Sequence, residues 1–305
     1  MQILNIIRWK NLLIIGLTQY LIKYAYLEPF GVIGSLNGLG MTLLILATLC
    51  IAAAGNIIND IYDIKADRIN KPNRVIVGQF ISEKRAYNLF FGLNIVGLVI
   101  GFYLSHAINK PPFFSLFVFA SIVLYVYATS LKKIALIGNI MISILVALSI
   151  IIVGVFDIMP LLQPHNQKIM MVYFKTISIY ALFAFSINVL REIVKDLEDI
   201  EGDLHVEANT LPIKIGKTYT TYFIAALNVI VISLVIYYIT STLQNQKIAI
   251  IYFLLCIVAP LCYTTYKLYN ASTKSIYTHI GNVYKWIMVF GILSLLLYKY
   301  VILYR

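Results

Sequence analysis

Long apolar runs, separated by short polar segments, make up most of this 305-residue chain. A helix that crosses a bilayer needs about 20 consecutive apolar residues, and within hydrocarbon only helices or closed barrels satisfy their backbone hydrogen bonds. Runs of this kind predict nine transmembrane helices, at residues 11–30, 38–59, 86–108, 112–131, 134–156, 169–190, 218–241, 248–266 and 283–303. No polar segment is long enough for a separate soluble domain. We therefore predict an all-α membrane protein with one polytopic domain, residues 1–305.

The composition supports this class and argues against others. Hydrophobic residues make up 61% of the chain and charged residues 12%, with a mean hydropathy of +0.86, which lies far outside the range of soluble proteins. A net charge of +11 would suit nucleic acid, but the basic residues are spread through short loops instead of one domain. We therefore expect the lipid bilayer, and no nucleic acid, as a partner.

The distribution of Lys and Arg predicts the orientation in the membrane. With a cytosolic N-terminus, 17 of the 24 basic residues lie on the cytosolic side, in the N-terminal segment and in loops expected at residues 60–85, 131–133, 191–217 and 267–285. The positive-inside rule then favours a multi-pass protein of the cell (plasma) membrane with its N-terminus inside. Lys23, within the first apolar run, is expected to snorkel to the interface or to face the interior.

Carboxylates are concentrated in two short windows. Ten of the 13 acidic residues lie within residues 60–67 and 192–207. Two sets within these windows repeat one spacing at an offset of 136 positions: a first set, Asp60, Asp63 and Asp67, and a second set, Asp196, Asp199 and Asp203. Positions i, i+3 and i+7 share one face of a helix. Each set is therefore expected to point three carboxylates in one direction.

The two aspartate sets predict a divalent metal site. Like charges this close are unfavourable unless a cation lies among them. Oxygen ligands without a His or Cys cluster suit Mg²⁺, which takes one or two carboxylates per ion and leaves its other positions to water and phosphate. Solvated acidic loops are the alternative interpretation, but the repeated spacing favours metal. We predict that the six aspartates bind Mg²⁺ and, through it, a diphosphate.

Basic residues beside the aspartates are candidates for direct contacts with the substrate's phosphates. Lys71 and Arg74 follow the first set, Lys132 belongs to a Lys pair between the two windows, and Lys195 precedes Asp196. The alternative role of such residues is to mark the cytosolic side of the membrane. The alternation of basic and acidic residues after residue 60 favours an anionic ligand held both directly and through metal.

Aromatic residues and histidines add few candidates. Most of the 23 tyrosines are expected in interfacial belts. Tyr62, Tyr125 and Tyr127 are best placed to stabilise a carbocation through their ring faces, and Tyr127 is predicted to contact substrate. His205, near the second set, is a minor candidate for a base.

These motifs resemble those of the UbiA-type intramembrane prenyltransferases. Residues 59–67 are similar to the family's first NDxxDxxxD motif, and residues 196–203 are similar to its second motif. The similarity also covers residues 8–11 and 210–216. It implies nine helices around a central cavity, capped by cytosolic loops that carry the two aspartate sets. It also implies an enzyme that binds an isoprenyl diphosphate through Mg²⁺ and transfers the prenyl group to a lipophilic acceptor within the membrane.

The same resemblance implies roles for individual residues. Four aspartates are expected to be catalytic, as metal and diphosphate ligands: Asp63, Asp67, Asp199 and Asp203. Asp60 and Asp196 are expected as further metal ligands. Four polar residues are expected to contact the diphosphate or the rest of the substrate: Asn11, Asn59, Lys132 and Asn139.

The acceptor is predicted from the same segments. Residues 67–74 and 191–203 are most similar to the subgroup that makes digeranylgeranylglyceryl phosphate for ether lipids, which implies geranylgeranyl diphosphate and geranylgeranylglyceryl phosphate as substrates. Aromatic quinone precursors of the menaquinone or ubiquinone type, and chlorins, stay open as acceptors. A non-catalytic transporter is the alternative from another class, but it would need acidic residues deep within the helices.

Overall fold

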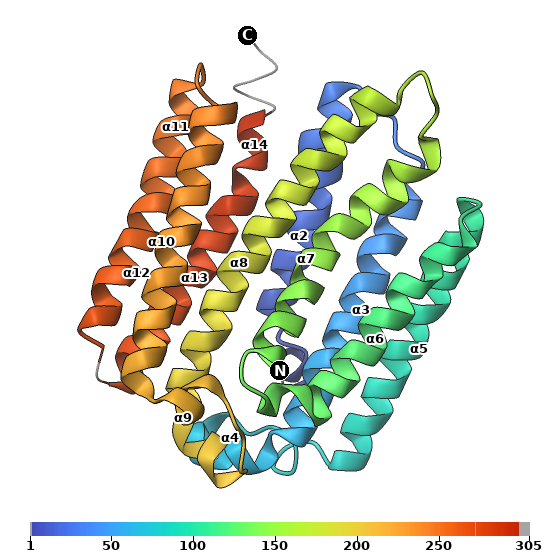
Figure 1. The fold of residues 1–305 in the computed structure, drawn as a ribbon. Coiled ribbons are helices and arrows are strands. Elements are labelled where there is room, and N and C mark those ends of the chain that lie inside the picture. The colour runs from blue at the N-terminus through green and yellow to red at the C-terminus, as the bar shows by residue number, and fades with distance from the viewer. Residues whose placement is uncertain (1, 272, 299–305) are drawn as a thin grey trace.

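The computed structural model describes residues 2–271 and 273–298, without the side chain of Arg74. Within these ranges, helices and short helical turns are the only regular elements apart from two isolated bridges. The α-helices shown in Figure 1 are α1 (Gln2–Ile6), α2 (Trp9–Leu21), α3 (Gly38–Tyr62), α4 (Ile64–Asn70), α5 (Glu83–Ala107), α6 (Phe114–Thr129), α7 (Ile137–Asp157), α8 (Gln167–His205), α9 (Leu211–Ile215), α10 (Lys217–Thr242), α11 (Lys247–Phe253), α12 (Ala259–Tyr269), α13 (Lys274–Leu293) and α14 (Leu295–Leu297).

Shorter 3₁₀ and π segments extend or join these helices. They are η1 (Ile22–Leu27), η2 (Glu28–Phe30), η3 (Pro72–Arg74), η4 (Pro111–Phe113), η5 (Leu131–Lys133), η6 (Met159–Leu161) and η7 (Leu254–Val258). Two of them, η1 and η7, are π-helical, and η7 joins α11 to α12 as one continuous helical segment.

Eight helical segments in the described ranges are long and apolar enough to cross a membrane, judged by length and composition. They correspond to eight of the nine expected spans. The remaining one, residues 11–30, is also helical, as α2 followed by η1, but is not among the eight. Asn11, Gln19 and Lys23 make it more polar than the others. The described residues therefore confirm an all-helical membrane bundle, with eight spans by this criterion.

The long helix α8 runs through the middle of the bundle, between α10 to α13 on one side and α3, α5 and α6 on the other (Figure 1). Near its start, Ile177 and Ala181 belong to a core shared with α2, α3 and α7. Nearer its end, Leu190 and Leu197 belong to a second core, shared with α10 to α13. One helix thus fixes the two halves of the bundle to each other.

The charged segment after residue 190 is a helix, which corrects the expected loop at residues 191–217. α8 has 39 residues and continues as far as His205. At a rise of 1.5 Å per residue it is about 58 Å long, roughly twice the thickness of a hydrocarbon core. The extension contains no proline, and Val194 and Leu197 bury an apolar face against the bundle. The expected loops at residues 60–85 and 267–285 are likewise partly helical, because α4, the start of α5 and the start of α13 lie within them.

A buried ion pair joins α7 to the segment after α2. Lys23 Nζ lies 3.0 Å from Asp157 Oδ2, and the two side chains are 4% and 0% exposed. Lys23 also donates to the Leu36 carbonyl at 2.6 Å, and the Leu36 amide donates to Asp157 Oδ1 at 2.9 Å. Lys23 therefore faces the interior, which decides between the two orientations expected for it. Asp157 ends α7 about 30 Å from the start of that helix, so the pair lies far from the aspartate sets.

Candidate active site

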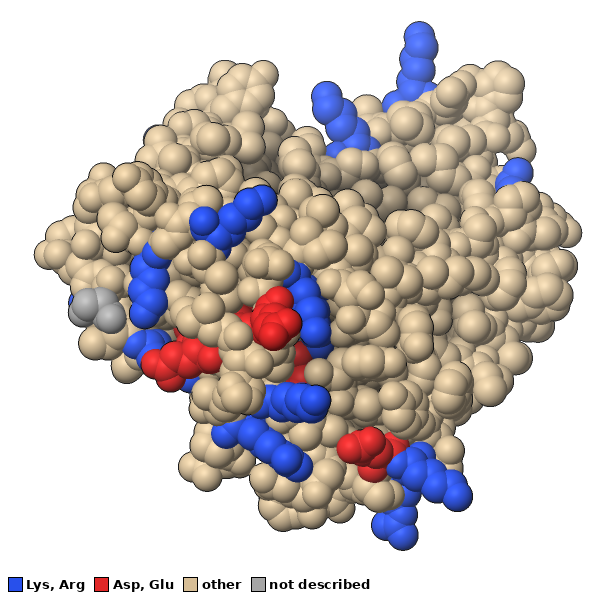
Figure 2. Space-filling view, turned by 60° about the horizontal axis from the view of Figure 1, so that its bottom comes forward, with Lys and Arg blue, Asp and Glu red and all other residues tan. Residues whose placement is uncertain are grey.

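A cavity of about 1500 Å³ lies at the end of the bundle where α3 passes into α4 and where α8 ends. All six aspartates of the two sets line it. Figure 2 looks towards this end, and the acidic side chains visible there lie beside basic ones. Residues far apart in the sequence thus share one charged chamber.

The first set lies across a break between two helices. α3 ends at Tyr62, α4 begins at Ile64, and Asp63 lies between them with φ −92° and ψ −2°. The backbone pairing continues through the break, because the Asp63 amide donates to the Asn59 carbonyl at 2.9 Å and the Asp67 amide to the Asp63 carbonyl at 2.8 Å. The expected single helical face is therefore bent at its middle aspartate.

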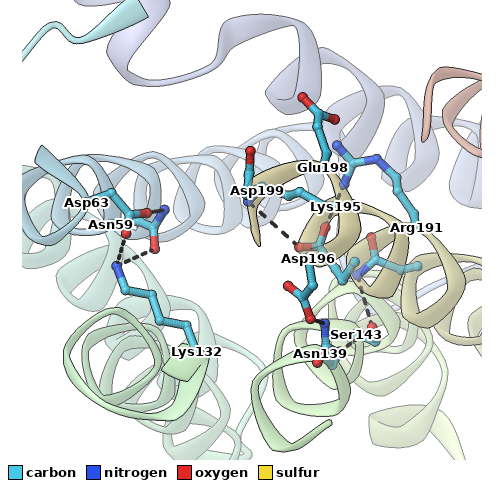
Figure 3. Close-up of polar contacts among 12 residues, drawn as sticks. Asn59, Asp63, Lys132, Asn139, Ser143, Arg191, Lys195, Asp196, Glu198 and Asp199 are labelled. Atoms are coloured by element: carbon cyan, nitrogen blue, oxygen red, sulfur yellow. Dashed lines mark hydrogen bonds and ion pairs between the residues drawn. The ribbon is translucent and has the colours of Figure 1, made fainter. Parts of the chain in front are cut away.

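Cations from other elements meet the first set. Arg8, between α1 and α2, donates from Nη2 to Asp60 Oδ1 at 2.7 Å. Lys132, on η5, forms an ion pair with Asp63, and its Nζ lies 3.4 Å from Asn59 Oδ1. Asn59 in turn donates to Asp63 Oδ2 at 2.7 Å. Figure 3 shows Asn59, Asp63 and Lys132 converging from two sides.

The second set lies on one continuous helix, as its spacing predicts. Asp196, Asp199 and Asp203 all belong to α8 and line the cavity. Lys71, at the end of α4, lies 2.9 Å from Asp199 and donates to its Oδ2. Asn139, on α7, donates to Asp196 Oδ2 at 2.9 Å (Figure 3). Neighbouring helices thus orient two of these three carboxylates.

Asn70 fixes the distance between the two sets. Its side chain donates to the Asp199 carbonyl and accepts from the Gly202 amide, each at 2.9 Å. The backbone carbonyl of Asn70 accepts from Lys274 at 2.7 Å. α4, α8 and α13 are therefore held together at one buried residue. A Cβ on Gly202 would lie 2.6 Å from the Ala66 carbonyl oxygen, so only glycine allows this approach.

Burial and charge shift the pKa values of two groups outside the membrane-spanning helices. Burial, and secondarily the charge of Asp63, raises the pKa of Asp67 above the ordinary value for an aspartate. Burial lowers the pKa of Lys132, although the ion pair with Asp63 opposes this shift. The surroundings of Asp67 therefore disfavour its charged form until a further cation lies beside it.

The donor set fits Mg²⁺ in chemistry, although no group of three or more His, Cys, Asp or Glu residues is gathered around one point in the part of the chain that the structure describes. Asp199 Oδ1 is buried and accepts no hydrogen bond of good geometry there, although Lys71 Nζ lies 2.9 Å from it. Among the described side chains, Asp67 and Asp203 have no ion-pair partner within 4.0 Å. Because Mg²⁺ usually takes only one or two carboxylates per ion and fills its shell with water and phosphate, these oxygens are suitable ligands.

Most of the other predicted site residues line the same cavity: Asn11, Asn59, Lys71, Tyr127, Lys132 and Lys195, together with Tyr62 and His205. Asn139 lies behind Asp196 and is not part of the lining, and Tyr125 is also outside it. The side chain of Arg74 lies outside the described residues. Nearly all of these residues therefore lie on one cavity, whereas Asn139 contacts the cavity only through Asp196.

Sequence reasoning missed Asn70, Glu192 and Lys285. Asn70 follows the first set by only three residues, but nothing in the pattern indicated that it would reach α8. Glu192 is buried and lies beside Arg191 at 2.7 Å. Lys285 was counted only as a basic loop residue, whereas it lies on α13 and its Nζ donates to Asn11 Oδ1 at 2.8 Å. The contacts of Asn70 and Lys285 join distant parts of the chain, whereas those of Glu192 are with its sequence neighbours on α8.

Comparison with known proteins identifies this arrangement. The model of the UbiA prenyltransferase family matches residues 30–286. The chain belongs to the UbiA prenyltransferase family. This UbiA-family chain is therefore a prenyltransferase, and the alternative of a non-catalytic transporter is rejected.

Several curated relatives of this UbiA-family chain carry the same name. Digeranylgeranylglyceryl phosphate synthase of Methanosphaera stadtmanae is 33% identical over 233 residues, which cover 75% of this chain and 76% of the relative. The enzyme of the same name from Methanobrevibacter smithii is 35% identical over 190 residues, 62% of each chain. The predicted resemblance to this subgroup is thus confirmed.

Solved structures show the same fold. A structure of digeranylgeranylglyceryl phosphate synthase aligns with 98% of this UbiA-family chain and 97% of its own, with a TM-score of 0.66 and 27% identity. A UbiA homolog from Archaeoglobus fulgidus bound to DMAPP and Mg²⁺ aligns with 97% of this chain and 99% of its own, with a TM-score of 0.56 and 19% identity.

Replacing Gly202 with alanine is expected to reduce prenyl transfer about 10- to 100-fold, because a shift of about 1 Å in reacting groups has effects of this size. The new methyl group would collide with Ala66 and Asn70 and push α4 away from α8. Steady-state transfer rates measure the effect. Gly281→Ala is the matched control, because a Cβ there meets nothing within 4 Å. Equal activity of the two variants would contradict a role for this close approach.

Proposed function

We propose that this UbiA-family enzyme transfers a geranylgeranyl group from geranylgeranyl diphosphate to the free hydroxyl of geranylgeranylglyceryl phosphate, with Mg²⁺ as cofactor. The observation that supports it most is the meeting of the two aspartate sets, from α3–α4 and from α8, on one cavity. The curated relatives, at 33% and 35% identity, carry the name of this activity.

The proposed reaction exchanges one carbon–oxygen bond for another. The bond between C1 of the prenyl group and the diphosphate oxygen breaks, and a bond forms between C1 and the acceptor oxygen. The hydroxyl proton leaves to solvent or to the released diphosphate. When bound, Mg²⁺ would neutralise charge on the departing diphosphate. Asp63, Asp67, Asp199 and Asp203 would hold the metal, with Asp60 and Asp196 completing the acidic lining.

Basic and aromatic side chains would serve the same reaction. Lys71, Lys132 and Lys195 are placed to donate to diphosphate oxygens as the leaving group gains charge, because all three line the cavity. Asn59, beside Lys132, would share this role. Tyr127, also on the lining, would present its ring to a developing allylic cation.

An apolar cavity next to the charged one would shield the reactive carbon from water. Its volume is about 100 Å³, and its lining includes Ile14 on α2, Ile187 on α8 and Met288 on α13. These residues lie one helical turn from Asn11, Arg191 and Lys285 of the charged cavity, so the two cavities are adjacent along three helices. A prenyl chain would extend from the polar part into the apolar part, where water cannot quench a cation.

The orientation completes the proposal. We place the charged cavity on the cytosolic side, where phosphorylated metabolites and Mg²⁺ are available, and count α2 with η1 as the ninth span. The basic residues in the segments at this end support that side through the positive-inside rule.

Purified protein with labelled geranylgeranyl diphosphate and a panel of acceptors tests the function. Transfer to geranylgeranylglyceryl phosphate, dependent on Mg²⁺ and abolished by a chelator, is the expected result. Transfer only to a naphthoate, a benzoate or a chlorin would overturn the acceptor assignment while leaving the prenyltransferase chemistry in place.

Affinity for Mg²⁺ is expected to fall as the pH falls through the range in which Asp67 gains a proton. Because the pKa of Asp67 is raised, its proton competes with the metal at a higher pH than the proton of an ordinary aspartate would. Titration calorimetry at several pH values, with a diphosphate analogue present, measures the dissociation constant. Asp67→Asn should bind more weakly but with a shallower dependence on pH. A dissociation constant for the wild type that does not change over this range would contradict the assignment.

A further inference from the structure

Positive and negative charges are distributed unevenly over the cavity. Near its outer end, Arg8, Lys71 and Lys132 each lie within 4.0 Å of an aspartate of one of the two sets. Earlier in α8, before the second aspartate set, Arg191 and Lys195 share a single carboxylate, Glu192, at 2.7 and 4.0 Å. Cations are therefore in excess in this inner part.

Lys285 adds to that excess. Among the described side chains, it has no carboxylate within 4.0 Å, and it donates a hydrogen bond to the neutral Asn11. Arg191 and Lys10, whose charges have the same sign as that of Lys285, line the same cavity. Two of these cations, Arg191 and Lys285, are half-buried and Lys10 is exposed; cations gathered in this way repel one another unless an anion lies between them. We define Lys285, Arg191, Lys10 and Asn11 as the inner cation cluster.

The inner cation cluster lies at the boundary between the polar and the apolar cavity. Asn11 precedes Ile14 by three residues, Arg191 follows Ile187 by four, and Lys285 precedes Met288 by three. Each pair is separated by about one helical turn. A ligand that fits both sides of this boundary carries an anionic group directly attached to an apolar chain.

We propose that the inner cation cluster binds the phosphate of the acceptor, as a subsite separate from the one that holds the diphosphate. The proposal rests on the function proposed above, since it presumes an acceptor with a phosphate monoester. An aromatic or chlorin acceptor would have no such group. The cluster would then determine specificity, because it selects a phosphorylated glycerol lipid over its dephosphorylated form.

The distance along α8 separates the two subsites. Arg191 and Asp199 are eight residues apart, which corresponds to about 12 Å of helix. A diphosphate held through metal at Asp199 and Asp203 would therefore lie two or more helical turns from Arg191. In the acceptor, the phosphate is joined through the glycerol backbone to the hydroxyl that reacts, so its subsite must lie close to the diphosphate but apart from it. Long Arg and Lys side chains cover the remaining gap.

The test is a comparison of Lys285→Met with the wild type, using two acceptors and one donor. We expect the KM for geranylgeranylglyceryl phosphate to rise about 10- to 100-fold, the effect of losing a charge-assisted contact with phosphate. The KM for geranylgeranyl diphosphate should stay within about twofold of the wild type. Preference for the phosphorylated acceptor over geranylgeranylglycerol should disappear, because this preference requires the ammonium group.

Two controls separate charge from shape. Lys285→Arg keeps the charge and should restore most of the preference for phosphate. Lys217→Gln removes an equal charge from an exposed position outside the cavity, at the start of α10, and should change neither KM. Lys10→Gln, at an exposed side chain of the cluster, gives the same comparison should Lys285→Met fail to fold.

The outcomes distinguish this proposal from the function on which it rests. A wild type that accepts no phosphorylated glycerol lipid overturns the function, and the subsite with it. A wild type that accepts this lipid, combined with a Lys285→Met variant that raises both KM values equally or neither of them, overturns the subsite alone. If the KM values for both substrates rose equally, Lys285 would instead bind the diphosphate or hold α2 against α13.

Discussion

Asp63→Ala and Asp199→Ala are each expected to lower the rate of prenyl transfer at least about 100-fold, the usual cost of removing one group that stabilises developing charge. The two residues come from opposite walls of the cavity and are held by Lys132 and Lys71. Without either one, the metal that holds the diphosphate would lose a carboxylate ligand on one side of the cavity. Single-turnover transfer from labelled geranylgeranyl diphosphate measures the loss.

These substitutions should leave the fold intact, since both side chains line the cavity and, although Asp199 is buried, neither belongs to a hydrophobic core. Melting temperatures in detergent check this point. Glu201→Ala is the matched control, because it removes an exposed carboxylate of the same helix that does not line the cavity. Full turnover in Asp63→Ala and Asp199→Ala, or equal loss in Glu201→Ala, would contradict the metal assignment.

Asp157→Ala is expected to destabilise the protein by about 3–5 kcal/mol, the range for removing one partner of a buried ion pair. Lys23 would be left charged and almost fully buried, and the amide of Leu36 would lose its acceptor. Unfolding in detergent, followed by circular dichroism, measures the change in free energy of unfolding.

A double replacement tests whether the charges themselves are needed. Lys23→Met combined with Asp157→Leu removes both charges and should recover much of the stability lost in Asp157→Ala, because an apolar pair avoids the cost of burying ions. Transfer activity of the double variant should be close to the wild type, since the pair lies far from the cavity. A double variant less stable than either single one would show that the pair itself holds the segment after α2.

Most of the transmembrane architecture could be predicted, because hydrophobic runs report directly on burial in lipid. The predictions were wrong where a high density of charged residues was interpreted as a loop. Residues 191–205 carry many charges and were assigned to a loop, yet they continue α8 because Val194 and Leu197 form an apolar face. In residues 11–30, polar residues lie inside a helix of the bundle. Buried Gln19 and Lys23 lower the hydropathy of this helix, although it packs within the bundle.

The grouping of the two aspartate sets on one cavity was predictable for a different reason. Asp63 and Asp199 were found because their spacing repeats, and a repeated spacing is visible in one dimension. Asn70 and Lys285 act through contacts with residues more than 100 positions away, Gly202 and Asn11, and no local pattern encodes such contacts. The bend at Asp63 was missed as well, because no proline or glycine marks it.

A structure of the protein with Mn²⁺ in place of Mg²⁺ and a non-hydrolysable thiolodiphosphate analogue of geranylgeranyl diphosphate tests the central claim most directly. Anomalous scattering locates the metal independently of the protein density. We predict metal ions at about 2.1 Å from carboxylate oxygens of both aspartate sets, the bond length of a hard octahedral ion, with the diphosphate between the sets. Metal bound by one set alone, or a diphosphate held away from the other set, would contradict the account.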